Sequence, residues 1–267
     1  MTAARCGASL FRGACAAIAL ACSWSAPAQE AAESGHVPPP PPSQPMPSMS
    51  EQEMDRVMDM HDDPLLAMFK LDQFERGHGD DTWSTDWEAE GWIGHDFDKL
   101  WLRTEGEVES GRTDVRIEAF WDHAFASFWD WQIGARHDLG SGPQRSWAAI
   151  GVQGLAPYWF TIEATAYLGD SGRTAFRFRA EYEQLLTQRL ILQPEFEANL
   201  YGKSDPARGV DSGLSDAALG LRLRYEIRRE VAPYVGVVWK HRSGDSEFFP
   251  DRAANETQLV AGLRVWF

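Results

Sequence analysis

Basic residues are scarce in this 267-residue sequence, which holds 25 Lys and Arg against 40 Asp and Glu, a net charge of −15. Nucleic-acid binding needs basic patches that neutralise phosphates, so we expect no nucleic-acid partner. The mean hydropathy is low, at −0.40. Beyond the N-terminus, no apolar run approaches the ~18 residues that a membrane-spanning helix needs, which excludes a helical membrane protein.

Cysteine is also nearly absent, and its few positions matter. Cys6, Cys15 and Cys22 all lie in residues 1–28, which have the features of a secretory signal peptide: positive charge, a short apolar stretch and the cleavage site Ala26-Pro27-Ala28. A lipoprotein anchor at Cys22 is the weaker alternative. The mature chain would then have no disulfide and no thiolate site. An acidic, cysteine-free, exported chain indicates a Gram-negative envelope.

Residues 29–63 differ in composition from the rest of the chain. This segment is rich in proline, with Pro38 to Pro42 in unbroken series. Such a sequence favours an extended, solvated chain over a packed fold. We therefore expect a disordered Pro/Met-rich tether over residues 29–63, and a separate folded domain over residues 64–267.

Apolar and polar residues alternate with a period of two through residues 64–267, which is typical of β-strands. Between residues 100 and 110, for example, Leu100 and Leu102 share one face while Arg103 and Glu105 share the other. We predict twelve strands, the first of which has a poor pattern: 68–76, 83–94, 100–110, 115–121, 129–138, 147–155, 160–168, 174–182, 190–200, 217–225, 231–239 and 257–267. Counting the first strand gives the even number found in bacterial single-chain outer-membrane barrels.

The predicted fold class is all-β: a transmembrane antiparallel up-and-down β-barrel of about 12 strands. A soluble β-sandwich would also show alternation. The barrel is favoured by charged polar faces, by alternating short and longer connections, and by tryptophans near strand ends that resemble an interfacial girdle. These tryptophans are Trp83, Trp121, Trp147, Trp239 and Trp266. We expect a cell outer-membrane location with both termini in the periplasm, and outer-membrane lipid as a partner.

The alternation points many charged side chains into the barrel lumen. These are Glu88, Glu90, Glu105, Glu107, Glu109, Glu118, Glu181, Glu195, Glu197, Arg103, Arg116, Arg177, Arg179, Arg222, Arg224 and Arg264. They could line a path for cations, or form a mutually neutralising salt-bridge network that fills the lumen. We favour the network.

Methionine is confined to one part of the chain. Apart from Met1, the methionines are Met46, Met49, Met54, Met58, Met60 and Met68. Thioethers are soft ligands that suit Cu(I). The sequence from Ser50 to Glu53 matches a capping box, and on the helix that it would begin Met54, Met58 and His61 share one face. The same residues also make a plain amphipathic stripe that could pack on the barrel mouth.

We predict a copper site from Met46, Met49, Met54, Met58, Met60 and His61, with Cu(I) preferred and Cu(II) held through His61. The remaining histidines do not cluster in the sequence. The motifs of nucleophilic hydrolases, phosphate-binding loops, dithiol sites and zinc proteases do not occur in it. We therefore expect that the protein is not an enzyme.

Several strings resemble the copper resistance protein B family of outer-membrane proteins. They include Trp87-Glu88-Ala89-Glu90-Gly91-Trp92-Ile93-Gly94, Gly151-Val152-Gln153-Gly154-Leu155-Ala156-Pro157-Tyr158-Trp159-Phe160 and Leu263-Arg264-Val265-Trp266-Phe267. The resemblance covers roughly residues 64–267. It implies a barrel that takes part in copper tolerance by binding, sequestration or export, with a Met- and His-rich N-terminal segment. Here that segment is thin, and Met58-Asp59-Met60-His61 is the nearest match.

Our functional hypothesis is an outer-membrane protein that binds copper through its periplasmic Met/His segment and contributes to copper sequestration or export. Its partners would be copper ions and periplasmic copper-resistance proteins. One alternative is an outer-membrane porin or a barrel enzyme of lipase or protease type, in which the Met segment is only structural. A weaker alternative is a protein that organises other copper proteins at the membrane.

Overall fold

A computed structural model describes residues 50, 53–54, 63–79, 82–243 and 254–267. The chain divides into two units, Met1–Met58 and Asp59–Phe267. Among the described residues, no helix has the length and apolar character needed to cross a membrane. The predicted signal peptide lies outside the described residues, as does most of the predicted tether.

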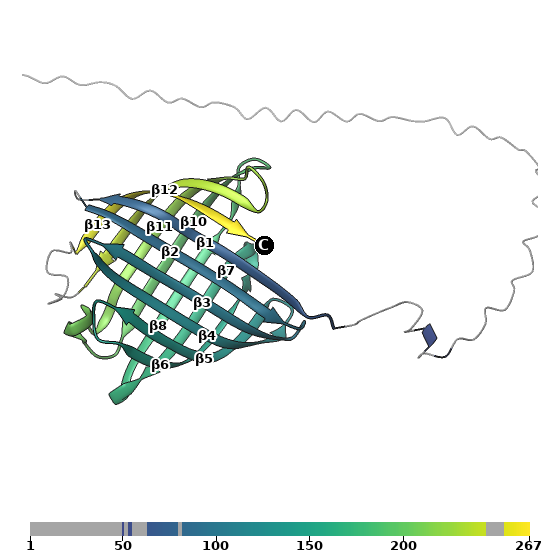
Figure 1. Cartoon of the computed structure of the whole chain (residues 1–267), viewed down its shortest axis with the longest axis horizontal. Helices are drawn as coiled ribbons and strands as arrows, with labels where there is room; N and C mark the ends of the chain where they lie inside the picture. Colours follow the sequence, from purple (N-terminus) through teal and green to yellow (C-terminus); the bar gives the residue numbers. More distant parts are fainter. Residues whose placement is uncertain (1–49, 51–52, 55–62, 80–81, 244–253) are drawn as a thin grey trace, which may run out of the picture. The chain divides into compact units, whose positions relative to one another are not determined.

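The second unit is a closed antiparallel β-barrel (Figure 1). Each long strand pairs with its sequence neighbour, and β13 pairs with β1 to close the sheet. The strands are β1 (Leu66–Gly79), β2 (Thr82–Gly94), β3 (Asp98–Glu109), β4 (Arg112–Ala126), β5 (Trp129–Gly140), β6 (Arg145–Ala156), β7 (Phe160–Gly169), β8 (Arg173–Tyr182), β9 (Gln184–Leu185), β10 (Leu190–Tyr201), β11 (Gly213–Tyr225), β12 (Val231–Arg242) and β13 (Asn255–Trp266). Because β9 has two residues and pairs only with β10, the barrel has the twelve long strands that the sequence predicted.

Burial is inverted relative to a soluble protein. Among the described residues, twenty-six buried side chains are polar or charged and twelve are apolar. Large apolar side chains instead cover the outside, where Leu100, Ile133 and Ile150 are about half exposed. Only a lipid solvent makes such an exterior favourable, because in water it would expose a continuous apolar surface. This pattern confirms the predicted transmembrane barrel and excludes the β-sandwich.

A β-bulge explains the poor pattern predicted for the first strand. The register of β1 shifts between Leu71 and Gln73 against β2, so the consecutive residues Asp72 and Gln73 are both buried. A bulge inserts one extra residue and reverses the alternation beyond it. Phe74 accordingly faces outward although it has the same parity as the buried Asp72. The bulge therefore turns Gln73 and Glu75 into the lumen, where strict alternation from Lys70 and Asp72 would have turned them outward.

An aromatic row crosses the inner wall of the barrel. In register from β2 to β10, it consists of Trp92, Trp101, Phe120, Gly134, Ala149, Tyr167, Ala175 and Tyr201. Small residues in the row leave room for the large neighbours, and Phe120 and Tyr167 are each only 1% exposed. Trp147 packs in the same cluster and is 5% exposed. The sequence-based placement of Trp147 in an outer girdle is therefore wrong, because β6 turns this side chain into the lumen.

The two ends of the barrel differ in their connections. The start of β1 and the end of β13 lie at one end (Figure 1). We call this the short-turn end, because it holds residues 95–97, 127–128, 157–159, 183–189 and 226–230. The opposite end, which we call the long-loop end, holds residues 110–111, 141–144, 170–172 and 202–212, together with the ends of β1 and β12 and the starts of β2 and β13. As the sequence predicted, two connections at this end are distinctly long, those between β10 and β11 and between β12 and β13. Short and longer connections do not alternate around the whole barrel, because residues 110–111 and 170–172 are as short as the turns at the other end.

In the first unit, the described residues show the predicted capping interaction. The Ser50 backbone N–H and hydroxyl both donate to the Glu53 carboxylate, at 3.3 and 3.0 Å. The Glu53 and Met54 amides donate to the Ser50 carbonyl oxygen, and residues 53–54 are helical. Met54 is 44% exposed. A Glu three residues after a Ser thus begins a helix here, as this pattern predicts.

We expect that Phe120→Ala lowers the free energy of unfolding of the barrel by about 3 kcal/mol, because it opens a cavity in the packed aromatic row. Urea titration of the protein refolded in lipid vesicles would measure this loss. The exposed-loop variant Ser212→Ala serves as the control and should not change stability. An equal stability for Phe120→Ala and wild type would show that the aromatic row does not support the barrel.

Candidate functional site

One row of side chains on the inner wall of the barrel alternates in charge. Cross-strand neighbours from β1 to β5 are Lys70, Glu90, Arg103, Glu118 and Arg136. Lys70 Nζ lies 2.5 Å from Glu90, and the Arg103 guanidinium lies 3.5 Å from Glu118. The Arg136 guanidinium ends the row against an aromatic ring, 4.8 Å from the centre of Tyr167. Opposite charges at adjacent positions stabilise neighbouring strands, so this row joins five strands of the wall.

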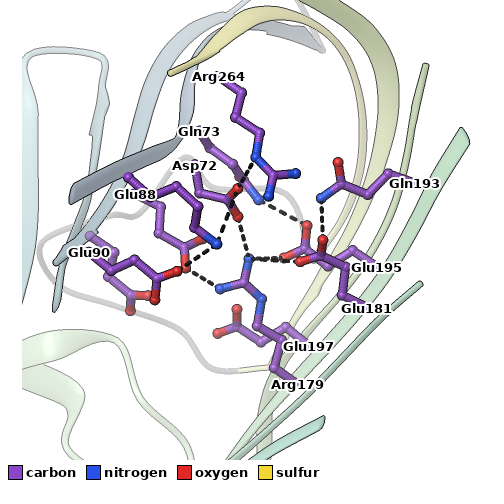
Figure 2. A network of polar contacts seen from close by, with 12 residues as sticks. Asp72, Gln73, Glu88, Glu90, Arg179, Glu181, Gln193, Glu195, Glu197 and Arg264 are labelled. Atoms are coloured by element: carbon purple, nitrogen blue, oxygen red, sulfur yellow. Dashed lines mark hydrogen bonds and ion pairs between the residues drawn. The ribbon is translucent and has the colours of Figure 1, made fainter. Parts of the chain in front are cut away.

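Arg179 connects opposite walls of the lumen (Figure 2). Its guanidinium is an ion-pair partner of Glu88 on β2 and lies 3.0 Å from Glu195 on β10 and 3.6 Å from Asp72 on β1. Arg264 on β13 approaches the same Asp72 at 2.9 Å. All five side chains are at least about five-sixths buried. Charges held this far from water need partners, and here each partner comes from a different strand.

A second row contains acids only. Glu75, Asp86, Glu107 and Asp114 are successive cross-strand neighbours on β1 to β4. Like charges directly opposite each other destabilise a sheet, so this row requires cations from elsewhere. The cations come from other walls and from the loop of residues 202–212.

Four basic side chains supply these charges. Arg222 lies 3.0 Å from Glu75, and Lys240 lies 3.3 Å from Asp86 and 2.8 Å from Glu107. Arg242 also reaches Glu107, at 2.9 Å, and Arg208 reaches Asp114 at 2.8 Å. The acidic row is therefore held by β11, β12 and one loop.

A cavity of ≈ 330 Å³ lies beside the acidic row. Arg208, Gly209 and Arg242 contribute to its lining, which places it toward the long-loop end. The lining holds ten Asp and Glu side chains against six Arg and Lys side chains. Field lines concentrate in a narrow cavity with low-dielectric walls, so an excess of carboxylates raises the local concentration of cations. The lumen thus combines a dense ion-pair network with an acidic chamber.

The family of the chain follows from three comparisons. A family model described as copper resistance protein B precursor matches residues 65–267. A copper resistance protein B homolog from Pseudomonas syringae pv. tomato is 46% identical over 212 residues, or 78% of this chain and 72% of the relative. This chain belongs to the copper resistance protein B family. A copper resistance protein B from Escherichia coli is 43% identical over the same shares of both chains.

Solved structures add a similarity of fold. The NanC porin superposes with a TM-score of 0.54 and 12% sequence identity, covering 72% of this chain and 98% of the porin. At that identity the comparison shows a shared barrel architecture alone. The barrel fold and the copper resistance protein B family together support an outer-membrane location. The sequence-based recognition of the family is confirmed.

The predicted copper ligands of this copper resistance protein B family member are mostly beyond the described part of the chain. Met46, Met49, Met58, Met60 and His61 lie outside the described residues, and only Met54 is described. Within residues 50, 53–54, 63–79, 82–243 and 254–267, the structure brings together no group of three or more His, Cys, Asp or Glu side chains that could hold a metal ion. The copper site therefore stays a prediction.

The predicted lumen residues are placed as the alternation indicated. Each charged side chain predicted to face inward is buried or partly buried, and most belong to ion pairs. Sequence reasoning did not find Asp72 or Glu75, because the alternation of this strand is broken by the bulge. It also did not find Lys240, Arg242 and Arg208, which bridge to the acidic row from distant parts of the chain. The acidic row itself was the signal in the sequence that basic partners must come from elsewhere, because four successive strands each place an acid at neighbouring positions.

We expect Arg179→Met to lower the free energy of unfolding by about 3 kcal/mol or more, since it leaves Glu88, Glu195 and Asp72 buried without their shared cation. Urea titration in lipid vesicles would measure the loss. Adding Glu88→Gln and Glu195→Gln should restore part of it, and the exposed-residue variant Lys203→Met should have no effect. If the neutralised triple variant were no more stable than Arg179→Met, the loss would come from packing and not from charge.

Proposed function

We propose that this protein is an outer-membrane copper-resistance protein that binds copper through its N-terminal Met/His segment and contributes to copper sequestration or export. The confinement of methionine carries the proposal. All methionines other than Met1 lie between Met46 and Met68, and none follows in the remaining 199 residues. An apolar barrel surface could use methionine anywhere, yet all but Met68 of these methionines lie in the polar, proline-rich segment, which favours ligation by thioether sulfur.

The proposed ligands are Met46, Met49, Met54, Met58, Met60 and His61. Thioethers favour Cu(I), and His61 would allow Cu(II) to bind as well. The helical residues 53–54 support this proposal, because a helix that continues from Ser50 would place Met54, Met58 and His61 on one face. Family membership supports the choice of metal, since both relatives are named for copper resistance.

The barrel would act after capture. Its acidic chamber offers a place where a released cation would be attracted. Periplasmic copper-resistance proteins are the proposed source of copper, with both termini of the chain in the periplasm. In this proposal copper binds first to the segment and then enters the barrel at the outer membrane.

Titration with Cu(I) tests the proposed ligands. We expect the protein with Met46, Met49, Met54, Met58 and Met60 replaced by Leu to lose most Cu(I) binding, because Leu keeps the apolar volume and removes the sulfur. Competition with a chromogenic Cu(I) chelator under reducing conditions would measure it. Met68→Leu, which lies on β1, is the matched control and should bind normally.

The same titration separates the segment from the barrel. Deleting residues 29–63 should abolish binding if the segment is the site. Full binding by both altered proteins would contradict the proposal and place copper within the barrel. Binding to neither the altered nor the wild-type protein would contradict any direct role in holding copper.

The porin alternative makes a different prediction about the lumen. Because the lumen is crossed by ion pairs such as those of Arg179 with Glu88 and Asp72, we expect low conductance for the wild-type protein in planar bilayers. Replacing Asp72 and Arg179 together by Ala removes opposite charges and side-chain volume from the crossing, so conductance should rise. Lys203→Ala, in a loop, should leave it unchanged. High and steady conductance of the wild-type protein would instead support an open porin.

A further inference from the structure

The turns at the short-turn end carry exposed apolar side chains. Each of the five turns has at least one, and the set is Phe97, Phe128, Tyr158, Trp159, Leu185, Leu186 and Ile227. Trp159 is 71% exposed and Tyr158 is 83% exposed. Turn tips that project into water are normally polar, because nothing offsets the cost of exposing large apolar groups there.

The long-loop end shows the opposite composition. Among its described connecting residues, no large apolar side chain is exposed. Small and polar residues stand there instead, such as Ser110, Gly111 and Gln144. The difference is therefore between two ends of one barrel, and not a general tendency of its loops.

The outer wall of the barrel also carries exposed polar residues at the long-loop end. At the long-loop end, outward positions of the strands include the exposed polar residues Arg76, His78, Ser146, Asn255 and Thr257. Exposed apolar residues also occur near these strand ends, namely Trp83, Leu168 and Leu214. The outer wall at this end is therefore mixed, and its apolar surface does not continue into the described loops.

At the short-turn end the apolar wall continues into the turns. Ile93 near the end of β2 is followed by Phe97, and Phe125 near the end of β4 is followed by Phe128. After the next turn, Phe160 opens β7 directly beyond Trp159. The lipid-facing surface therefore extends to the tips of these turns.

The turn of residues 157–159 has two aromatic residues in a backbone conformation that is unfavourable for them. Tyr158 and Trp159 have φ values of 68° and 67°, in the left-handed region that bulky side chains rarely adopt. Glycine would fit this backbone without strain. Two consecutive strained aromatic residues that are largely exposed indicate a role for their rings outside the folded chain.

From these observations we propose that the short-turn end is embedded in lipid, with the tips of its turns inserted at the boundary between headgroups and acyl chains. Tyrosine and tryptophan favour that depth, because each has an apolar ring and a polar hydrogen-bonding group. Apolar residues occur on every short turn around the circumference. A lipid annulus contacts the whole circumference, whereas a single protein partner would need a patch on one side.

A polar group at this end is consistent with headgroup depth. Asp98 accepts hydrogen bonds from the Trp121 indole at 3.0 Å and pairs with His123 at 2.9 Å. The three side chains satisfy one another, as groups near the acyl boundary need to do. The barrel would thus sit flush with the membrane at one end and project beyond it at the other.

Spin labels on single cysteines test this depth. Residues 29–267 contain no cysteine, so one introduced cysteine is the only attachment site in the protein without its predicted leader. Ser127→Cys at the short-turn end and Ser212→Cys at the long-loop end are a matched pair of exposed serines. Ile227→Cys reports from another part of the rim, with Gln144→Cys as its counterpart. Each labelled protein is refolded in phosphatidylcholine vesicles, and folded protein alone is measured.

The readout is the collision rate with oxygen, which concentrates in lipid, against that with a water-soluble nickel chelate. We expect the labels at Ser127 and Ile227 to meet the nickel chelate several-fold less often than those at Ser212 and Gln144. Adding Phe128→Ser to the Ser127 label should raise its nickel collisions. Equal nickel accessibility at both ends would overturn the lipid proposal and assign the apolar tips to a protein partner.

Discussion

The charges buried inside this barrel need partners, either on a neighbouring strand or across the lumen. Because the belt that faces lipid is apolar, the strands turn most of their charged side chains inward, where many are shielded from water. Rows of opposite charges on adjacent strands supply some of these partners. Cationic side chains such as Arg179 and Lys240, which reach opposite walls, supply others. Because each buried ion pair loses much if one member is removed, the strands become mutually dependent. Barrel closure, the filled lumen and the acidic chamber all depend on this pairing.

The bulge in β1 is a small feature with a large effect on that network. At the bulge, Asp72 lies close to both Arg179 and Arg264. Beyond it, the parity of β1 reverses and Glu75 joins the acidic row. The aromatic row from Trp92 to Tyr201 crosses the same inner wall and stabilises it by packing. Aromatic packing and ion pairs therefore both fill the lumen, and the acidic chamber lies beside the acidic row.

Membership of the copper resistance protein B family covers the barrel, while the proposed copper ligands lie ahead of it. The two copper resistance protein B relatives are 46% and 43% identical over 212 matched residues, so the barrel can be recognised as a family member whatever the composition of the segment ahead of it. To bind copper as proposed, the tether needs only its ligand side chains and no packed fold. The thin Met/His segment of this chain is thus compatible with a fully retained barrel.

The sequence by itself determined the fold class, the number of long strands, the facing of nearly every lumen charge and the family. It could do so because a period of two is a local property, and a membrane barrel turns that period directly into inside and outside. Only the tertiary structure decided which charges meet. Arg208 and Asp114 are far apart in the chain, and Trp147 faces inward because of the register of β6. Barrel closure sets these neighbours, since pairing across a lumen depends on the position of all twelve strands at once.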